Sequence, residues 1–159
     1  MLTVEQVETF NTDGYLSVDS VLSPEELDEL RRVTDEFVEQ SRNVTENDAT
    51  FDLEPGHTAE SPQLRRIIRP VSKHSVYEKF VHHEDILNIV ESLLGPNLRY
   101  HNNKMNMKNS GHGSAVEWHQ DWGFYPHTNG SVLAAPHGMR ECATQPYNAT
   151  ARWSYRDPL

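Results

Sequence analysis

The sequence predicts an α+β domain in which helices occupy the N-terminal part and strands follow. Two helix starts with side-chain caps precede residue 25, and Gly95-Pro96 closes the last helical stretch. Beyond that stop, apolar residues recur weakly at every second position, which is the period of a strand. A length of 159 residues suits one domain with one core.

The first helix is expected to start after Thr3, because Thr3 and Gln6 form a capping-box pattern. Asp13-Gly14 should end it, since glycine adopts positive φ at little cost. A short strand is then expected at Tyr15, Leu16 and Val18.

A second helix should begin after Ser23, with Pro24 in its first position, and end near Arg42. Its apolar stripe comprises Leu27, Leu30, Val33 or Thr34, and Phe37. The polar residues 43–63 are predicted to be a loop that can order over a site. A third helix is expected over residues 76–94.

Strands are predicted within residues 98–108, over 115–121 and from 131 to 135. The candidate inward positions of the first of these segments are Leu98, Tyr100, Met105 and Met107.

The composition excludes several classes of partner. The net charge of -10 argues against nucleic acid and against an anionic membrane surface. No apolar run approaches the roughly 20 residues that span a bilayer, and the N-terminus does not resemble a signal peptide. A single cysteine, Cys142, excludes an internal disulfide, so a reducing, cytoplasmic setting is expected. The expected partner is a small-molecule substrate, and the oligomeric state stays open.

The segment His119-Gln120-Asp121 carries the chemistry. On a strand, alternation directs the side chains of His119 and Asp121 to the same face. An imidazole and a carboxylate so placed can bind one side of a metal, and a second histidine would complete the ligand set of non-haem iron oxygenases. Four nearby aromatic residues are expected to wall a cavity: Trp118, Trp122, Phe124 and Tyr125. For Trp122 and Tyr125 the alternative is a position in the core.

Three stretches resemble the phytanoyl-CoA dioxygenase (PhyH-like) family, together covering residues 1–135. They are "FNTDGYLSVDSVLSPEELDELR", "NKMNMKNSGHGSAVEWHQD" and "EWHQDWGFYPHTNGSVLAA". The resemblance implies a mainly β, double-stranded β-helix (a cupin-like jelly roll) with N-terminal flanking helices, incomplete in this chain. It also implies a dioxygenase that uses Fe(II), 2-oxoglutarate and dioxygen to hydroxylate a small organic or lipid-like molecule.

By the same resemblance, His119 and Asp121 are the catalytic iron ligands, and Asn106 faces 2-oxoglutarate. Lys104 and Tyr125 are further candidates for contact with this cosubstrate. The competing interpretation is a solvated strand face for Asn106 and Lys104, and a core position for Tyr125. Three other histidines are not expected to be ligands: His101, His112 and His127.

The sequence departs from the family after residue 135. The family places a second iron histidine and an arginine for 2-oxoglutarate on a late strand. Here the later candidates lack that context: His127, His137, Arg140, Arg152 and Arg156. Residues 136–159 are therefore interpreted as an atypical tail, produced by a frameshift or a mis-assigned exon.

Three alternatives remain open at this point. The chain could be a non-catalytic fragment that lacks the second iron histidine and the 2-oxoglutarate arginine. It could be a cupin-like metal isomerase or a zinc-binding protein. A helical interaction module built on residues 24–42 is the third, although its stripe is more simply explained as core.

Overall fold

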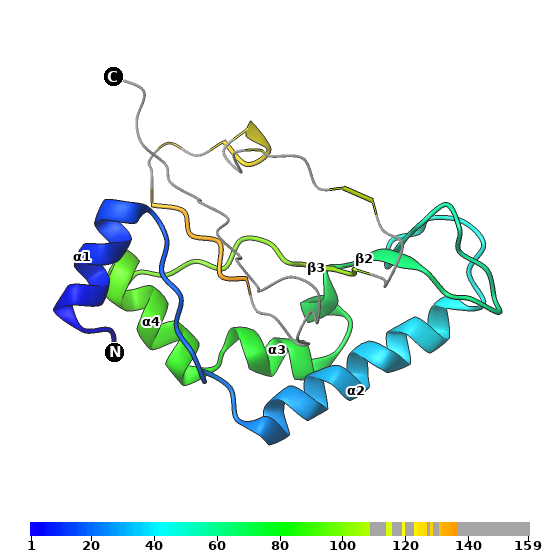
Figure 1. Ribbon diagram of the computed structural model, residues 1–159, viewed down its shortest axis with the longest axis horizontal. Coiled ribbons are helices and arrows are strands. Elements are labelled where there is room, and N and C mark those ends of the chain that lie inside the picture. Colours follow the sequence, from blue (N-terminus) through cyan, green and yellow to red (C-terminus); the bar gives the residue numbers. More distant parts are fainter. Residues whose placement is uncertain (109–113, 116–118, 120–122, 127, 129–130, 137–159) are drawn as a thin grey trace. The chain divides into compact units, whose positions relative to one another are not determined.

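The structure, a computed structural model, describes residues 1–108, 114–115, 119, 123–126, 128 and 131–136. The chain divides into two compact units. Figure 1 labels most of their helices and strands. The first comprises Met1–Val21, His83–Arg99 and Glu117–Leu159, and the second comprises Leu22–His82 and Tyr100–Val116. Among the described residues, no helix is long and apolar enough to cross a membrane.

The first unit contains helices α1 (Val4–Asp13) and α4 (Glu84–Leu94), which contact each other. The capping box at Thr3 is confirmed, as is the stop at Gly14, which has φ 80° and donates its N–H to the Phe10 carbonyl. The strand predicted after Gly14 is wrong. These residues form no strand, and Ser20 interrupts the extended backbone with φ 56°.

The helix predicted over residues 76–94 is in fact two helices, α3 (Ser75–Val81) and α4. His83 is extended, and its Nδ1 accepts the Asp85 N–H, so the side chain caps α4. A histidine is an unusual cap, so the polar run His82-His83-Glu84-Asp85 does not signal a helix start as a serine or an aspartate before it would. The stop at Gly95 is confirmed: its φ is 87°, and its N–H donates to the Glu91 carbonyl.

Helix α2 (Pro24–Ser41) begins the second unit and confirms the predicted start. The Ser23 hydroxyl accepts the Glu26 N–H, and the Glu26 carboxylate accepts the Ser23 N–H. The predicted stripe is confirmed, since one face is buried and Leu27 is half-buried beside it. The buried residues are Leu30, Val33, Thr34, Phe37 and Ser41.

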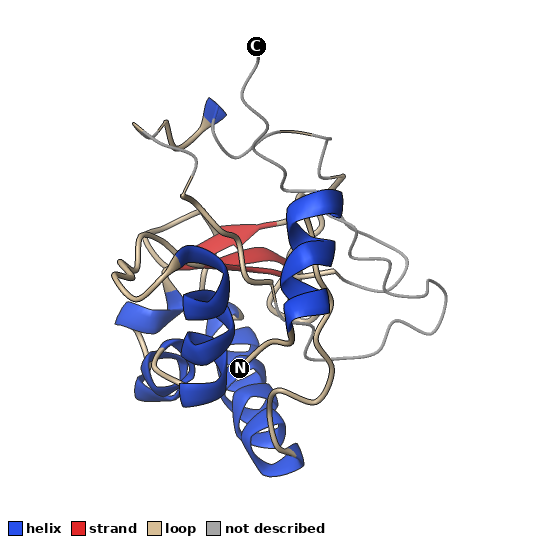
Figure 2. Ribbon diagram, turned by 90° about the vertical axis from the view of Figure 1, so that its left-hand side faces the viewer, coloured by secondary structure: helices blue, strands red, loops and turns tan. Residues whose placement is uncertain are grey.

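Three antiparallel strands form the sheet of the second unit in the order β1-β2-β3 (Figure 2). They are β1 (Phe51–Leu53), β2 (Leu64–Ile68) and β3 (Lys104–Asn106). The loop predicted over 43–63 is thus wrong at β1, and β2 was not predicted. Strands this short are defined by their partners and not by a local period.

One face of this sheet forms the core with α2 and α3, which lie on the same side of it in Figure 1. Phe51 and Ile67 are cross-strand partners, and both are buried. The Phe37 ring packs at 6.2 Å from the Phe51 ring and at 6.1 Å from the Tyr77 ring. A 3-10 turn, η1 (Pro70–Ser72), leads from β2 toward α3.

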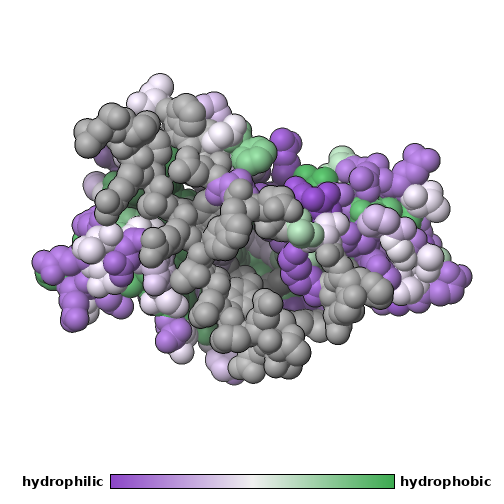
Figure 3. Space-filling view, turned by 45° about the horizontal axis from the view of Figure 1, so that its top comes forward, coloured by the Kyte–Doolittle hydropathy of each residue, from purple (hydrophilic) through white to green (hydrophobic). Residues whose placement is uncertain are grey.

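The predicted fold class is confirmed as α+β, because a small antiparallel sheet accompanies four helices among the described residues. Helices outnumber strands there, so a mainly β composition is not observed, and the jelly roll stays a prediction. Residues 131–136 form no strand, contrary to expectation, and most of 115–121 lies outside the described residues. The described surface seen in Figure 3 is mostly hydrophilic with scattered apolar residues.

Candidate functional site

The sheet of the second unit carries a polar row on the face opposite its core. Asp52 on β1 is the cross-strand partner of Arg66 on β2, and Arg66 is the partner of Asn106 on β3. Their neighbours Phe51, Ile67 and Met105 form a second row across the same three strands. Because side chains alternate along a strand, the two rows face opposite ways.

The assignment of faces follows from the contacts of the apolar row. The Met105 sulfur lies 3.7 Å from the Thr34 hydroxyl and 4.0 Å from the Tyr77 hydroxyl, so Met105 points toward α2 and α3. The inward prediction for Met105 is therefore confirmed. Its neighbours Lys104 and Asn106 are exposed on the other face.

The structure thus brings together two of the predicted cosubstrate residues. Lys104 and Asn106 are two positions apart on one strand and share the polar face. Lys104 is the cross-strand partner of Ile68, and Asn106 that of Arg66.

Arg66 and Asp52 belong to this face, and sequence reasoning missed both. Arg66 Nε lies 2.8 Å from Asp52 Oδ2, with the two side chains 32% and 18% exposed. The Nε atom is shielded from solvent and makes no hydrogen bond to the described residues, so the contact is an ion pair without a directed hydrogen bond. In the sequence, the signal for Arg66 was its place directly before Ile67, a polar-to-apolar step that fits the alternation of a strand.

Glu54 connects the end of β1 to the segment that precedes His119. Its carboxylate accepts the Ser114 N–H at 2.8 Å and the Ser114 hydroxyl at 2.6 Å. Lys108 Nζ donates to the Ser114 carbonyl at 2.7 Å. The Ser114 hydroxyl, and then its N–H, lower the pKa of Glu54, with a smaller contribution from Arg65 and Lys108.

His119 lies in the first unit and is half-buried. Its imidazole meets the Phe124 ring edge to face, with centroids 5.3 Å apart and an interplanar angle of 86°. Tyr125 is half-buried in the same unit, whereas Phe124 is 67% exposed. Asp121 lies outside the described residues, so its place beside His119 stays a prediction.

The described part of the chain holds no group of three or more His, Cys, Asp or Glu side chains that could bind a metal. Several histidines accept hydrogen bonds from backbone N–H groups instead. His57 Nδ1 accepts the Gln63 N–H, and His74 Nδ1 accepts the Val76 N–H. His101 is exposed, and His112 and His127 lie outside the described residues.

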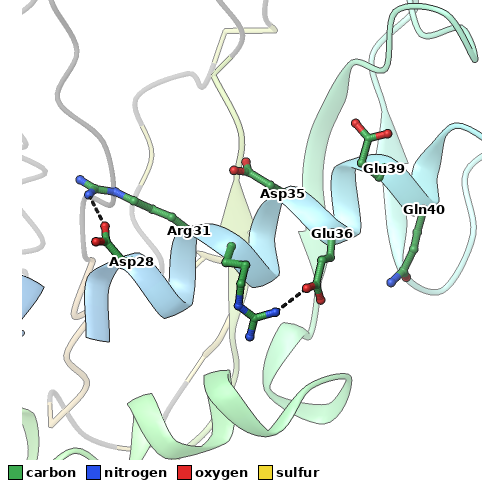
Figure 4. A pocket seen from close by; sticks show the side chains of 7 residues that line it. Asp28, Arg31, Asp35, Glu36, Glu39 and Gln40 are labelled. Atoms are coloured by element: carbon green, nitrogen blue, oxygen red, sulfur yellow. Dashed lines mark hydrogen bonds and ion pairs between the residues drawn. The ribbon is translucent and has the colours of Figure 1, made fainter. Parts of the chain in front are cut away.

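An open hollow of about 770 Å³ lies along α2, lined entirely by polar and charged side chains (Figure 4). Arg31 pairs with Asp28, and Arg32 pairs with Glu36, at the spacings that favour ion pairs on a helix. In each pair, the two charges neutralise one another at a solvated surface. We interpret the hollow as the outer face of the helix, and we do not assign it as a site.

Comparison with known proteins identifies a family whose sequences resemble this chain. The family described as phytanoyl-CoA dioxygenase (PhyH) matches residues 10–144, and so the match extends into the tail that begins at residue 136. The boundary drawn there from the sequence stays a prediction.

Two curated relatives are dioxygenases. The chain is 32% identical over 129 residues to a probable alpha-ketoglutarate-dependent hypophosphite dioxygenase of Stutzerimonas stutzeri, over 81% of this chain and 45% of the relative. It is 23% identical over 116 residues to the ectoine dioxygenase of Streptomyces coelicolor, over 73% of this chain and 37% of the relative. The aligned part is therefore less than half the length of each relative.

Proposed function

Because this chain belongs to the phytanoyl-CoA dioxygenase family, we propose that it contributes part of the active site of an Fe(II)- and 2-oxoglutarate-dependent dioxygenase. The observation that carries the proposal is a half-buried imidazole, His119, followed two residues later by the carboxylate of Asp121. Relatives with 2-oxoglutarate-dependent activity support the same chemistry.

The donor chemistry of this chain fits ferrous iron. A neutral imidazole and a carboxylate are the ligand types of the facial triad in non-haem iron oxygenases. Phe124 packs against the ring of His119 and limits its rotation. The role proposed for His119 and Asp121 is to hold the metal, and the carboxylate offsets part of its charge.

When bound, ferrous iron would activate dioxygen, and 2-oxoglutarate would supply two electrons as it is decarboxylated to succinate and carbon dioxide, so that one oxygen atom enters succinate and the other enters the substrate. The side chains proposed to orient the cosubstrate are Asn106, Lys104 and Tyr125. Asn106 offers an amide donor and Lys104 a cation for the carboxylates of 2-oxoglutarate. The aromatic ring of Tyr125 would exclude water, and its hydroxyl would donate a hydrogen bond.

The substrate is proposed to be a small molecule. The two relatives are named for hypophosphite, a small oxyanion, and for ectoine, so the class extends from inorganic ions to organic molecules. A small organic or lipid-like substrate stays within the proposal, because the substrate is set by the site and not by the fold.

The test is anaerobic calorimetric titration of the purified chain with Fe(II), with and without 2-oxoglutarate. We expect ferrous binding that strengthens in the presence of 2-oxoglutarate and that His119→Gln and Asp121→Asn each abolish. His101→Gln, at an exposed histidine outside the motif, is the matched control and should bind as the parent does. Ferrous affinity that is absent, or that survives both ligand substitutions, would overturn the proposal, and a preference for zinc would favour a cupin-like zinc protein instead.

A further inference from the structure

We propose that Arg66 is an anion-recognition residue on the polar face of the sheet, where it binds a carboxylate or another oxyanion. This deepens the proposed function, on which it rests, by assigning a negatively charged group to the small molecules that the site binds. Arg66 lies on the central strand, between its cross-strand partners Asp52 and Asn106.

The described helices of the second unit leave the polar face uncovered. The helices α2 and α3 pack on the opposite face, where Ile67 is fully buried. The Arg66 side chain is 32% exposed although its Nε is shielded, so its exposure lies elsewhere on the side chain. Asn106, its neighbour on β3, is exposed beside it.

The charge of this face differs from that of the chain. The protein carries a net charge of -10, whereas the described strand residues of this face include the cations of Arg66 and Lys104 and the carboxylate of Asp52. A guanidinium is planar and presents paired donors that match a carboxylate or phosphate geometry. Asn106, the cross-strand partner of Arg66 on β3, adds an amide donor on the neighbouring strand.

The ion pair with Asp52 leaves the guanidinium only partly satisfied. Its Nε donor is shielded and makes no hydrogen bond to the described residues, although the Asp52 carboxylate is 2.8 Å away. An unsatisfied shielded donor is unfavourable, so a ligand oxygen that reorients the group would gain free energy. Asp52 therefore has two effects: it holds Arg66 over the sheet, and it competes with an incoming anion.

The competing interpretation is a structural brace between β1 and β2. The two readings predict opposite results for Asp52→Asn. A brace loses stability and gains no ligand affinity. A recognition site binds anions more tightly, because a competing negative charge has been removed.

The experiment uses the full chain without metal, labelled for nitrogen–proton NMR of arginine Nε–H groups. It is titrated separately with 2-oxoglutarate and with inorganic phosphate. We expect the Arg66 signal to shift saturably with at least one probe. Affinity should fall about tenfold in Arg66→Gln, less in Arg66→Lys, and rise in Asp52→Asn, because a guanidinium–carboxylate pair is charge-assisted and bidentate.

Arg32→Gln removes an exposed arginine that pairs with Glu36 on α2 and is the matched control. It should bind both probes as the parent does. Thermal melting of each variant establishes whether it is folded. If Arg66→Gln is unfolded, Arg66→Lys supplies the test.

Each outcome decides the proposal. A shift with phosphate alone supports it and assigns the anion to the substrate, while a shift with 2-oxoglutarate alone supports it and assigns the anion to the cosubstrate. No shift with either probe, unchanged affinity in folded Arg66 variants, or an Asp52→Asn variant that is destabilised without tighter binding would overturn it. This titration contains no iron, so its result does not depend on whether the chain binds Fe(II). A failure of the anion proposal and a failure of the proposed function can therefore be distinguished.

Discussion

The carboxylate of Glu54 accepts two hydrogen bonds from Ser114, one from its N–H and one from its hydroxyl, and so fixes the chain five residues before His119. Glu54 itself is only 6% exposed, at the end of β1. The segment that leads to the proposed iron motif is thereby attached to the sheet edge by a charge-assisted contact. Lys108 reinforces it through the Ser114 carbonyl.

This contact predicts acid-sensitive stability. The pKa of Glu54 is lowered from its ordinary value of 4.5, chiefly by the Ser114 hydroxyl. A lowered folded-state pKa contributes stability that is present above the unfolded value and lost as the pH falls through the folded value. In urea denaturation, the unfolding free energy of the parent should therefore fall as the pH drops below 4.5, and Glu54 should account for part of this loss.

Glu54→Gln should be less stable than the parent at neutral pH and should lose less stability on acidification. Ser114→Ala should show the same change in pH dependence, because it removes the main cause of the lowered pKa. Glu46→Gln, an exposed loop position, is the control and should track the parent. If Glu54→Gln and the parent lose stability in parallel as the pH falls, the proposed linkage is wrong.

The ring cluster around Phe37 predicts a large loss of stability on truncation. Phe37 is 6% exposed and contacts the rings of Phe51 and Tyr77, so Phe37→Ala leaves a cavity where α2 meets the sheet. The expected cost is about 3–5 kcal/mol of unfolding free energy, measured by urea denaturation. Val4→Ala, at a 76% exposed position, should change stability by no more than about 0.5 kcal/mol. A similar cost at both positions would contradict the assigned core.

The buried hydroxyl pair of Thr34 and Tyr77 predicts a second pH dependence. The hydroxyl oxygens are 2.8 Å apart, and burial raises the pKa of Tyr77 above its ordinary value of 10.0. A raised pKa contributes stability that is fully present below the unfolded value and lost as the pH rises through the folded value. Tyr77 should therefore ionise above the ordinary tyrosine range when tyrosinate absorption is followed in alkali.

Tyr77→Phe tests this assignment, because it removes the titrating hydroxyl and keeps the ring. It should remove one tyrosine from the part of the titration above the ordinary range. The substitution should cost about 1 kcal/mol of unfolding free energy, since Thr34 retains its bond to the Leu30 carbonyl. Tyr15→Phe, whose side chain is half-buried in the other unit, is the control. A titration curve unchanged by Tyr77→Phe would show that another tyrosine is responsible.

Helix ends were readable from the sequence because their causes are local. Thr3 and Ser23 supply hydroxyl caps, and Gly14 and Gly95 adopt the positive φ that ends each helix. The break at His83 was missed, because histidine rarely caps a helix. Local chemistry thus predicts a boundary only where the residue has a strong intrinsic preference.

Features that depend on pairing were not readable in the same way. Alternation correctly placed Met105 on the core face. The inward position expected for Tyr100 was wrong, since this residue is 50% exposed. The sequence could not show that Asp52 and Arg66 lie beside Asn106, because register between strands far apart in the chain is set by the packed core. The apolar partners Phe51 and Ile67 fix that register, and the polar row follows from it.

The edge-to-face contact of His119 with Phe124 predicts that an aromatic neighbour supports ferrous binding. Phe124→Ala removes the ring that packs against the imidazole, and an aromatic pair is worth about 0.5–1.5 kcal/mol. Ferrous affinity, measured anaerobically by calorimetry, should therefore fall about two- to tenfold. Phe124→Tyr keeps the ring and should retain the affinity. Val132→Ala, at another exposed apolar position of the same unit, should leave it unchanged. If Phe124→Ala binds iron as tightly as the parent, the ring contributes nothing to the orientation of the ligand, and His119 must be held by its other contacts.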